Sequence, residues 1–129
     1  MASVLLAEDN PDTVDFLSRR LSEAGFDVLV ARNGADAFAL ALREKPDAIV
    51  IDVNLPRVAG DEVIRRLRAE AALGVTPVIF VTADYTTRVA QSLVPGQVLC
   101  MEKAIRARAL IENLQGLLAS QGRGGARPG

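Results

Sequence analysis

Hydrophobic residues along this chain gather in short runs that are separated by amphipathic stretches. Five runs are rich in valine, isoleucine and leucine, and they cover residues 4–7, 26–31, 48–51, 78–81 and 98–101. Only Asp27 interrupts the second run. The runs lack the alternation of apolar and polar residues that marks a half-exposed strand, so they predict strands buried on both faces of a sheet.

The amphipathic stretches between the runs predict helices. Asn10 is expected to cap the first helix and Pro11 to begin it, because asparagine accepts hydrogen bonds from free N–H groups and proline suits the first helical position. Asn33 is expected to cap a second helix that ends before Pro46. The remaining helices are expected at about residues 60–72, 84–93 and 104–120.

Strands that alternate with helices predict an α/β fold of five βα units, in which helices cover both faces of a doubly wound parallel sheet. The length of 129 residues fits one domain with its own core. We expect this domain at residues 1–120. Residues 121–129 are rich in glycine and arginine and are expected to form a flexible tail.

Composition and charge exclude several classes of function. The net charge of −1 argues against a dedicated nucleic-acid-binding domain. The absence of histidine excludes histidine-based triads, histidine-ligated metals and a phosphohistidine carrier. The single cysteine, Cys100, excludes an internal disulfide and fits a reducing cytoplasm. No run approaches the ~18 apolar residues of a membrane span, and the N-terminus lacks the features of a signal peptide.

Polar side chains follow four of the predicted strands at their carboxyl ends. Glu8 and Asp9 follow the first strand, and Asp52 follows the third. Thr82 closes the fourth strand and Lys103 follows the fifth. The carboxyl ends of parallel strands meet at the edge of the sheet where α/β proteins bind ligands, so we expect these five side chains to share a site.

Three neighbouring carboxylates predict a Mg²⁺ site. Like charges a few ångströms apart resist ionisation unless a cation is present, and Mg²⁺ prefers a few oxygen ligands together with water. A carboxylate can also attack phosphorus to form an aspartyl phosphate. Phosphoryl transfer then depends mainly on positioning and charge neutralisation, which Mg²⁺, the Lys103 ammonium and the Thr82 hydroxyl would supply.

Each of these residues also has an ordinary structural interpretation. The segment Glu8-Asp9-Asn10-Pro11 is typical of a helix N-cap with acidic residues near the helix dipole. Asp52 is typical of a turn at the end of a strand. The joint spacing of the residues favours a shared site over these separate interpretations.

The chain resembles the receiver domain of two-component response regulators over about residues 2–120. The resemblance rests on Glu8-Asp9-Asn10, Asp52-Val53-Asn54-Leu55-Pro56 with Gly60, Thr82-Ala83 and Lys103. It implies a flavodoxin-like fold with strand order 2-1-3-4-5. It also implies that Asp52 is the phosphoacceptor, that Asp9 binds Mg²⁺ directly, and that Glu8 helps through a water. The backbone carbonyl of Asn54 is the implied third protein ligand.

The resemblance implies further that Thr82 is the switch hydroxyl and that Lys103 pairs with the phosphoryl group. Two positions depart from the family pattern. Ala104 replaces the usual proline after the lysine, and a cis peptide without proline costs about 2.5–4 kcal/mol. Either that strain is kept, or the peptide is trans and Lys103 is aimed differently. Cys100 replaces the usual switch aromatic, so we expect standard phosphorylation chemistry with a non-standard readout.

The predicted function is that of a stand-alone, cytoplasmic response regulator. A histidine kinase or histidine phosphotransfer protein would supply the phosphoryl group, and phosphorylation would switch binding to a downstream partner protein. Beyond self-catalysed phosphoryl transfer and autodephosphorylation, no enzyme activity is expected. Neither direct DNA binding nor membrane binding is expected, and a homodimer through the last helix is left open.

Two other classes of function are weighed against this one. A degenerate receiver would bind partners without phosphorylation, and the replacements at Ala104 and Cys100 motivate that alternative. A Mg²⁺-dependent phosphohydrolase is less favoured, because no second aspartate lies two residues after Asp52. No P-loop or dinucleotide-binding fingerprint supports a nucleotide-binding protein.

Overall fold

Five short strands form one parallel sheet in the computed structural model, which describes residues 2–70, 73–74, 76–82, 98–102 and 107–120. The strands are β1 (Ser3–Ala7), β2 (Asp27–Ala31), β3 (Ala48–Asp52), β4 (Val78–Thr82) and β5 (Val98–Glu102). Their order across the sheet is β2-β1-β3-β4-β5, and all neighbouring pairs are parallel. The α/β class and the strand order are therefore as predicted.

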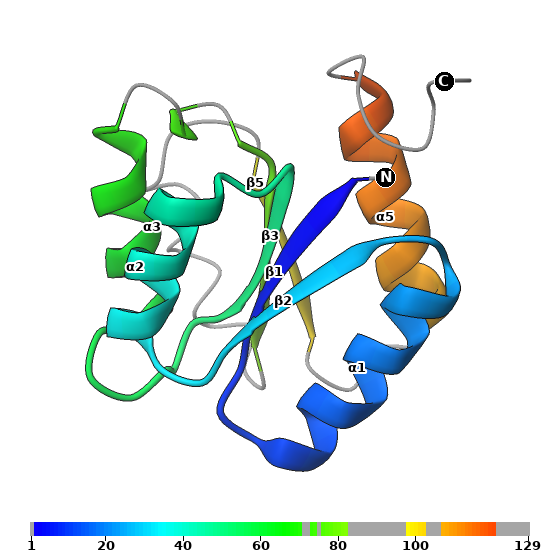
Figure 1. Ribbon diagram of the computed structural model, residues 1–129, viewed down its shortest axis with the longest axis horizontal. Helices are drawn as coiled ribbons and strands as arrows, with labels where there is room; N and C mark the ends of the chain where they lie inside the picture. Colours follow the sequence, from blue (N-terminus) through cyan, green and yellow to red (C-terminus); the bar gives the residue numbers. More distant parts are fainter. Residues whose placement is uncertain (1, 71–72, 75, 83–97, 103–106, 121–129) are drawn as a thin grey trace.

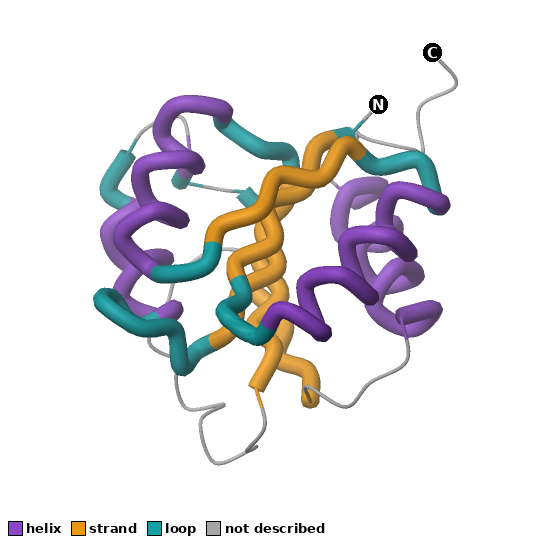
Figure 2. The backbone as a smooth tube through the Cα atoms, turned by 60° about the horizontal axis from the view of Figure 1, so that its bottom comes forward, coloured by secondary structure: helices purple, strands orange, loops and turns teal. Residues whose placement is uncertain are grey.

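Within the described residues, four helices cover the two faces of this sheet. They are α1 (Pro11–Glu23), α2 (Gly34–Glu44), α3 (Gly60–Arg68) and α5 (Ala107–Ser120). The helices α2 and α3 lie on one face, and α1 and α5 lie on the other (Figure 1). Figure 2 shows the same three layers, with the strands between the two pairs of helices. The predicted helix at residues 84–93 and the predicted start of the last helix lie outside the described residues.

Side chains of the central strands alternate between two apolar cores, because successive residues of a strand point to opposite faces of the sheet. Leu5 and Ile51 belong to the core beneath α2 and α3, whereas Leu6 and Val50 belong to the core beneath α1 and α5. Phe80 is fully buried in the first of these cores. This double burial explains why these strands appear in the sequence as unbroken apolar runs.

The second strand corrects the prediction that all five runs are buried on both faces. β2 lies at one edge of the sheet, and Val30 is 39% exposed. It begins at Asp27, so Phe26 precedes the strand and is buried among the residues beneath α1 and α5. Hydrophobic content alone does not distinguish a central strand from an edge strand.

Two asparagines cap helices where the sequence predicts them. The Asn10 side chain accepts hydrogen bonds from the N–H groups of Asp12 (2.9 Å) and Thr13 (3.1 Å). The Asn33 side chain accepts one from the N–H of Asp36 (2.8 Å). These bonds satisfy N–H groups that have no partner within the helix, which fixes the starts of α1 and α2.

The third helix ends at Arg68, earlier than the predicted residue 72. The Arg68 guanidinium donates hydrogen bonds to the backbone carbonyls of Leu73 (3.1 Å) and Thr76 (2.6 Å). Burial lowers the pKa of this guanidinium. These contacts fold the chain back against the last turn of α3. No local pattern in the sequence predicts them. Among the described helices, none combines the length and the apolar character that crossing a bilayer requires.

Candidate functional site

Three carboxylates meet at the carboxyl edge of the sheet. β1 and β3 are neighbours, with Ala7 paired to Ile51, so Glu8 and Asp52 lie at the ends of adjacent strands. Carboxylate oxygens of Glu8, Asp9 and Asp52 all lie within 4.8 Å of one another. The strand order thus brings together acidic residues that are far apart in the sequence.

Two of these carboxylates are buried and the third is exposed. Glu8 is 2% exposed and Asp52 is 3% exposed, whereas Asp9 faces solvent. Negative charges held this close, with little water around two of them, repel one another strongly. A cation at the cluster would offset that repulsion, and the exposed side at Asp9 leaves room for water ligands.

Backbone groups fix the orientation of both buried acids. The Glu8 N–H donates to the carbonyl of Ala31 (3.0 Å), which continues the pairing of β1 with β2 beyond the strand. The Glu8 carboxylate accepts a hydrogen bond from the N–H of Asn10 (3.0 Å). The Asp52 carboxylate accepts one from the N–H of Asn54 (3.0 Å), as in an Asx turn.

Gly60 lets the chain return close to Asp52. The Gly60 N–H donates to the carbonyl of Val53 (2.8 Å). A Cβ atom at residue 60 would overlap the Asp52 carbonyl oxygen and lie only 2.9 Å from the carbonyl carbon. The glycine is needed for this close approach, which brings the first turn of α3 against the end of β3.

The donor set fits Mg²⁺. The cluster offers carboxylate oxygens, which a hard cation prefers, and the chain contains no histidine. Mg²⁺ takes few protein ligands and keeps several waters, which suits a cluster that is buried on one side and open on the other. The arrangement can therefore hold this cation and balance the charge of the acids.

The other predicted site residues are only partly covered by the described residues. Thr82 ends β4, and its neighbour Val81 pairs with Asp52, so the backbone of Thr82 lies at the same edge of the sheet. Cys100 lies in β5 opposite Phe80. Nothing is described of the side chains at these two positions. Lys103 and Ala104 lie outside the described residues, and with them both alternatives for their peptide bond, a strained cis bond or a trans bond that aims Lys103 differently.

The cap of α1 and the acidic cluster come from neighbouring residues but are expected to act independently. Substitution of Asn10 tests this. Asn10→Ala is expected to lower the free energy of unfolding by about 1 kcal/mol, because two N–H groups of α1 lose their acceptor. The backbone N–H that binds Glu8 remains, so Mg²⁺ affinity is expected to stay near that of the wild type. Thermal unfolding and calorimetric Mg²⁺ titration measure the two effects.

The matched control for this substitution is Asn33→Ala, which removes the corresponding cap of α2. Both variants are expected to lose similar stability and to keep Mg²⁺ affinity. A large loss of Mg²⁺ affinity in Asn10→Ala alone would show that the cap and the cluster act as one unit.

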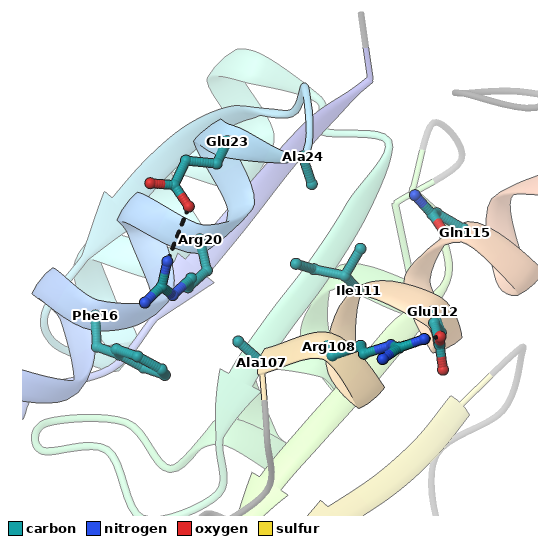
Figure 3. A pocket seen from close by; sticks show the side chains of 9 residues that line it. All are labelled: Phe16, Arg20, Glu23, Ala24, Ala107, Arg108, Ile111, Glu112 and Gln115. Atoms are coloured by element: carbon teal, nitrogen blue, oxygen red, sulfur yellow. Dashed lines mark hydrogen bonds and ion pairs between the residues drawn. The ribbon is translucent and has the colours of Figure 1, made fainter.

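A groove lies between α1 and α5, away from the acidic cluster, and Figure 3 shows the side chains that line it. Its apolar surface includes the half-exposed Phe16, with the Arg20 guanidinium 5.3 Å from the centre of the ring. The charged groups pair within their own helices, as Arg20 with Glu23 (3.0 Å) and Arg108 with Glu112 (3.3 Å). The groove therefore lacks the converging polar groups of a small-molecule site.

Comparison with known proteins identifies the chain's relatives. A family model described as the response regulator receiver domain matches residues 4–115. The chain is 39% identical to protein PilH of Pseudomonas aeruginosa over 82 residues, which is 64% of this chain and 68% of PilH. It is 35% identical to the transcriptional regulatory protein TrcR of Mycobacterium tuberculosis over 116 residues, which cover 89% of this chain. The matched region spans less than half of TrcR, namely 44%.

Solved structures show the same fold. The chemotaxis response regulator CheY4 of Vibrio cholerae is 28% identical, with a TM-score of 0.84 over 92% of this chain and 99% of that one. The receiver domain of the sensor histidine kinase PA1611 of Pseudomonas aeruginosa is 27% identical, with a TM-score of 0.83 over 90% of this chain and 96% of that one. That structure holds a magnesium ion in its active-site cleft.

Receiver domains are phosphoryl acceptors of two-component systems rather than conventional enzymes, and a histidine kinase is the partner that such a system implies. They coordinate Mg²⁺ at an acidic pocket, which corresponds to the cluster of Glu8, Asp9 and Asp52. The matching family model, the strand order and the acidic cluster agree, and this chain belongs to the family of response regulator receiver domains.

Proposed function

We propose that Asp52 is the residue that accepts the phosphoryl group. The observation that carries this proposal is the convergence of the Glu8, Asp9 and Asp52 carboxylates within 4.8 Å. Within that cluster, Asp52 lies on β3, between the acids that follow β1 and the end of β4 at Thr82. A phosphoryl group on Asp52 would have metal ligands on one side and a hydroxyl-bearing residue on the other.

The proposed reaction is a phosphoryl transfer from a phosphohistidine of a histidine kinase or a histidine phosphotransfer protein. An Asp52 carboxylate oxygen forms a bond to phosphorus while the phosphorus–nitrogen bond of the donor breaks, and the imidazole leaves with the electron pair. The product is an acyl phosphate, a mixed anhydride in which one carboxylate oxygen bridges the carbonyl carbon and phosphorus. Most of the catalysis in such a transfer comes from position and charge.

Each remaining site residue has a proposed part in this step. Asp9 and Asp52 would hold Mg²⁺ directly, Glu8 would act through a water, and the Asn54 carbonyl would complete the protein ligands. When bound, Mg²⁺ supplies positive charge beside the phosphoryl oxygens. Thr82 and Lys103 are proposed to bind those oxygens as a hydroxyl donor and an ammonium group, a role that rests on their places after β4 and β5 in the sequence.

Phosphorylation adds negative charge at the edge of the sheet, and such a change can favour one of two arrangements of nearby elements. We propose that this change alters binding to a downstream partner protein in the cytoplasm, where reducing conditions suit the single cysteine.

The division into a domain at residues 1–120 and a flexible tail, and the stand-alone state, stay predictions. The complete acidic cluster supports phosphoryl acceptance over the alternative of binding without phosphorylation.

Incubation with a small phosphodonor such as acetyl phosphate tests the proposed function. With Mg²⁺ present, intact-mass measurement is expected to show the gain of one phosphoryl group per chain. With a chelator in place of Mg²⁺, the gain is expected to disappear, because repulsion within the acidic cluster opposes the approach of an anionic donor. No gain with any donor in the presence of Mg²⁺ would contradict the proposal and favour a phosphorylation-independent binding module.

A further inference from the structure

The loop between β3 and α3 is held at its middle by a residue of another element. The Pro56 carbonyl accepts hydrogen bonds from two N–H groups, those of Val58 (2.9 Å) and Gly34 (3.0 Å). Val58 belongs to the loop itself, whereas Gly34 is the first residue of α2. The first residue of α2 is thus hydrogen-bonded to the loop that follows Asp52.

Residues 56–58 of this loop have an unusual backbone conformation. The bond from the Val58 N–H to the Pro56 carbonyl closes a three-residue γ-turn around Arg57, whose φ is 72°. A residue with a side chain seldom adopts this left-handed conformation, which is strained and persists only where surrounding contacts hold it. The Gly34 N–H supplies one such contact, and the partly buried Val58 side chain, packed against the core beneath α2 and α3, supplies another.

Gly34 makes the contact possible because it lacks a side chain. A Cβ atom at residue 34 would overlap the carbonyl oxygen of Val58, and it would lie 2.6 Å from the Val58 carbonyl carbon and 2.7 Å from the Val58 Cβ. Any larger residue would therefore push the turn away from α2. The requirement arises from close packing, since Gly34 itself does not have a positive φ.

Several hydrogen bonds fix the course of this loop. The Asn54 N–H binds the Asp52 carboxylate at the start of the loop, and the Gly60 N–H binds the Val53 carbonyl at its end. The bond from Gly34 to Pro56 holds the middle, beyond the point where the Val53 N–H donates to the Val81 carbonyl of β4 (3.3 Å). The buried side chains of Val53 and Leu55 anchor the first part of the loop, so loss of the Gly34 bond would loosen the turn at Arg57 and, through it, the position of the backbone at the exposed Asn54.

We propose that Gly34 is a positioning residue for the acidic site. By seating the turn at Arg57 it fixes the backbone beside Asp52, including the Asn54 carbonyl that would face Mg²⁺. Gly34 touches neither the metal site nor the donor, and it acts through the loop. This inference rests on the proposed function, because it concerns the geometry of the same Mg²⁺ and phosphoryl site.

The substitution Gly34→Ala tests the proposal with readouts that do not depend on phosphorylation. In the metal-free protein, amide hydrogen exchange at Asn54 and Val58 is expected to become faster, while exchange in the central strands stays slow. Calorimetric titration is expected to show Mg²⁺ affinity lowered by at least about tenfold, the scale seen when supporting groups around a metal site are lost. Circular dichroism reports whether the variant remains folded.

Two control variants separate positioning from general stability. Ala41→Gly loosens the same helix at a fully buried position about two turns beyond Gly34, so it is expected to lower the melting temperature and to keep wild-type Mg²⁺ affinity. Gly116→Ala makes the same chemical change in α5, where a Cβ meets nothing within 4 Å, and it is expected to keep affinity without loss of stability.

A second variant covers the case in which Gly34→Ala fails to fold. Val58→Gly removes the side chain that presses the turn against α2, and it is expected to lower Mg²⁺ affinity and speed exchange at Asn54 in a folded protein. Wild-type affinity in folded Gly34→Ala, or in Val58→Gly, would overturn the proposal, as would an equal loss of affinity in Ala41→Gly. Failure of the wild-type chain itself to bind Mg²⁺ or accept a phosphoryl group would instead contradict the proposed function.

Discussion

Replacing Asp52 with asparagine is expected to abolish phosphoryl acceptance while the fold is retained. The amide has nearly the same shape as the carboxylate, and its oxygen can still accept the hydrogen bond from the N–H of Asn54. It lacks the negatively charged oxygen that attacks phosphorus, so no acyl phosphate can form at this position. Intact-mass measurement after incubation with a small phosphodonor and Mg²⁺ checks this, and circular dichroism checks the fold.

The matched control is Asp27→Asn at the exposed start of the edge strand β2, outside the acidic cluster. This variant is expected to accept one phosphoryl group as the wild type does. If Asp52→Asn gained a phosphoryl group under the same conditions, the assignment of the acceptor would be wrong.

Replacing Asp9 with asparagine is expected to change Mg²⁺ affinity and metal-free stability in opposite directions. Loss of a charged ligand is expected to weaken Mg²⁺ binding by about 100-fold or more, beyond the loss seen for supporting groups. Without metal, removal of one of three crowded negative charges is expected to stabilise the fold by about 1 kcal/mol, a modest value because Asp9 is exposed and its charge is screened. Thermal unfolding with chelator and with excess Mg²⁺ measures both effects.

Asp12→Asn is the control for Asp9→Asn, because Asp12 is an exposed acid in the first turn of α1 that does not belong to the cluster. This substitution is expected to leave Mg²⁺ affinity unchanged. It is expected to lower the stability of the fold slightly, because a negative charge in the first turn interacts favourably with the positive end of the helix dipole. A loss of metal-free stability in Asp9→Asn would show that repulsion among the three carboxylates does not destabilise the metal-free fold.

Features that depend on local sequence were predictable from the sequence. The apolar runs predict the strands, and Asn10 and Asn33 mark the beginnings of two helices. The meeting of Glu8 with Asp52 required the strand order as well. That order came from the resemblance to receiver domains, because spacing along the chain does not reveal which strands are neighbours.

Features that depend on contacts between distant segments were not predictable. The end of α3 depends on hydrogen bonds from Arg68 to carbonyls that follow the helix. The exposure of β2 depends on its place at the edge of the sheet. In the sequence, Gly34 is an ordinary glycine after a capping asparagine, and only the folded chain reveals its contact with Val58.

The acidic cluster is proposed to use Mg²⁺ to place a phosphoryl group on Asp52. The most direct measurement is peptide mapping of the chain after treatment with a phosphodonor, with and without Mg²⁺. We expect a single phosphorylated peptide that contains Asp52, formed only with Mg²⁺, and we expect hydroxylamine, which cleaves acyl phosphates, to remove its phosphoryl group. A stable phosphoryl group on a serine, threonine or tyrosine, or one on a different aspartate, would contradict it.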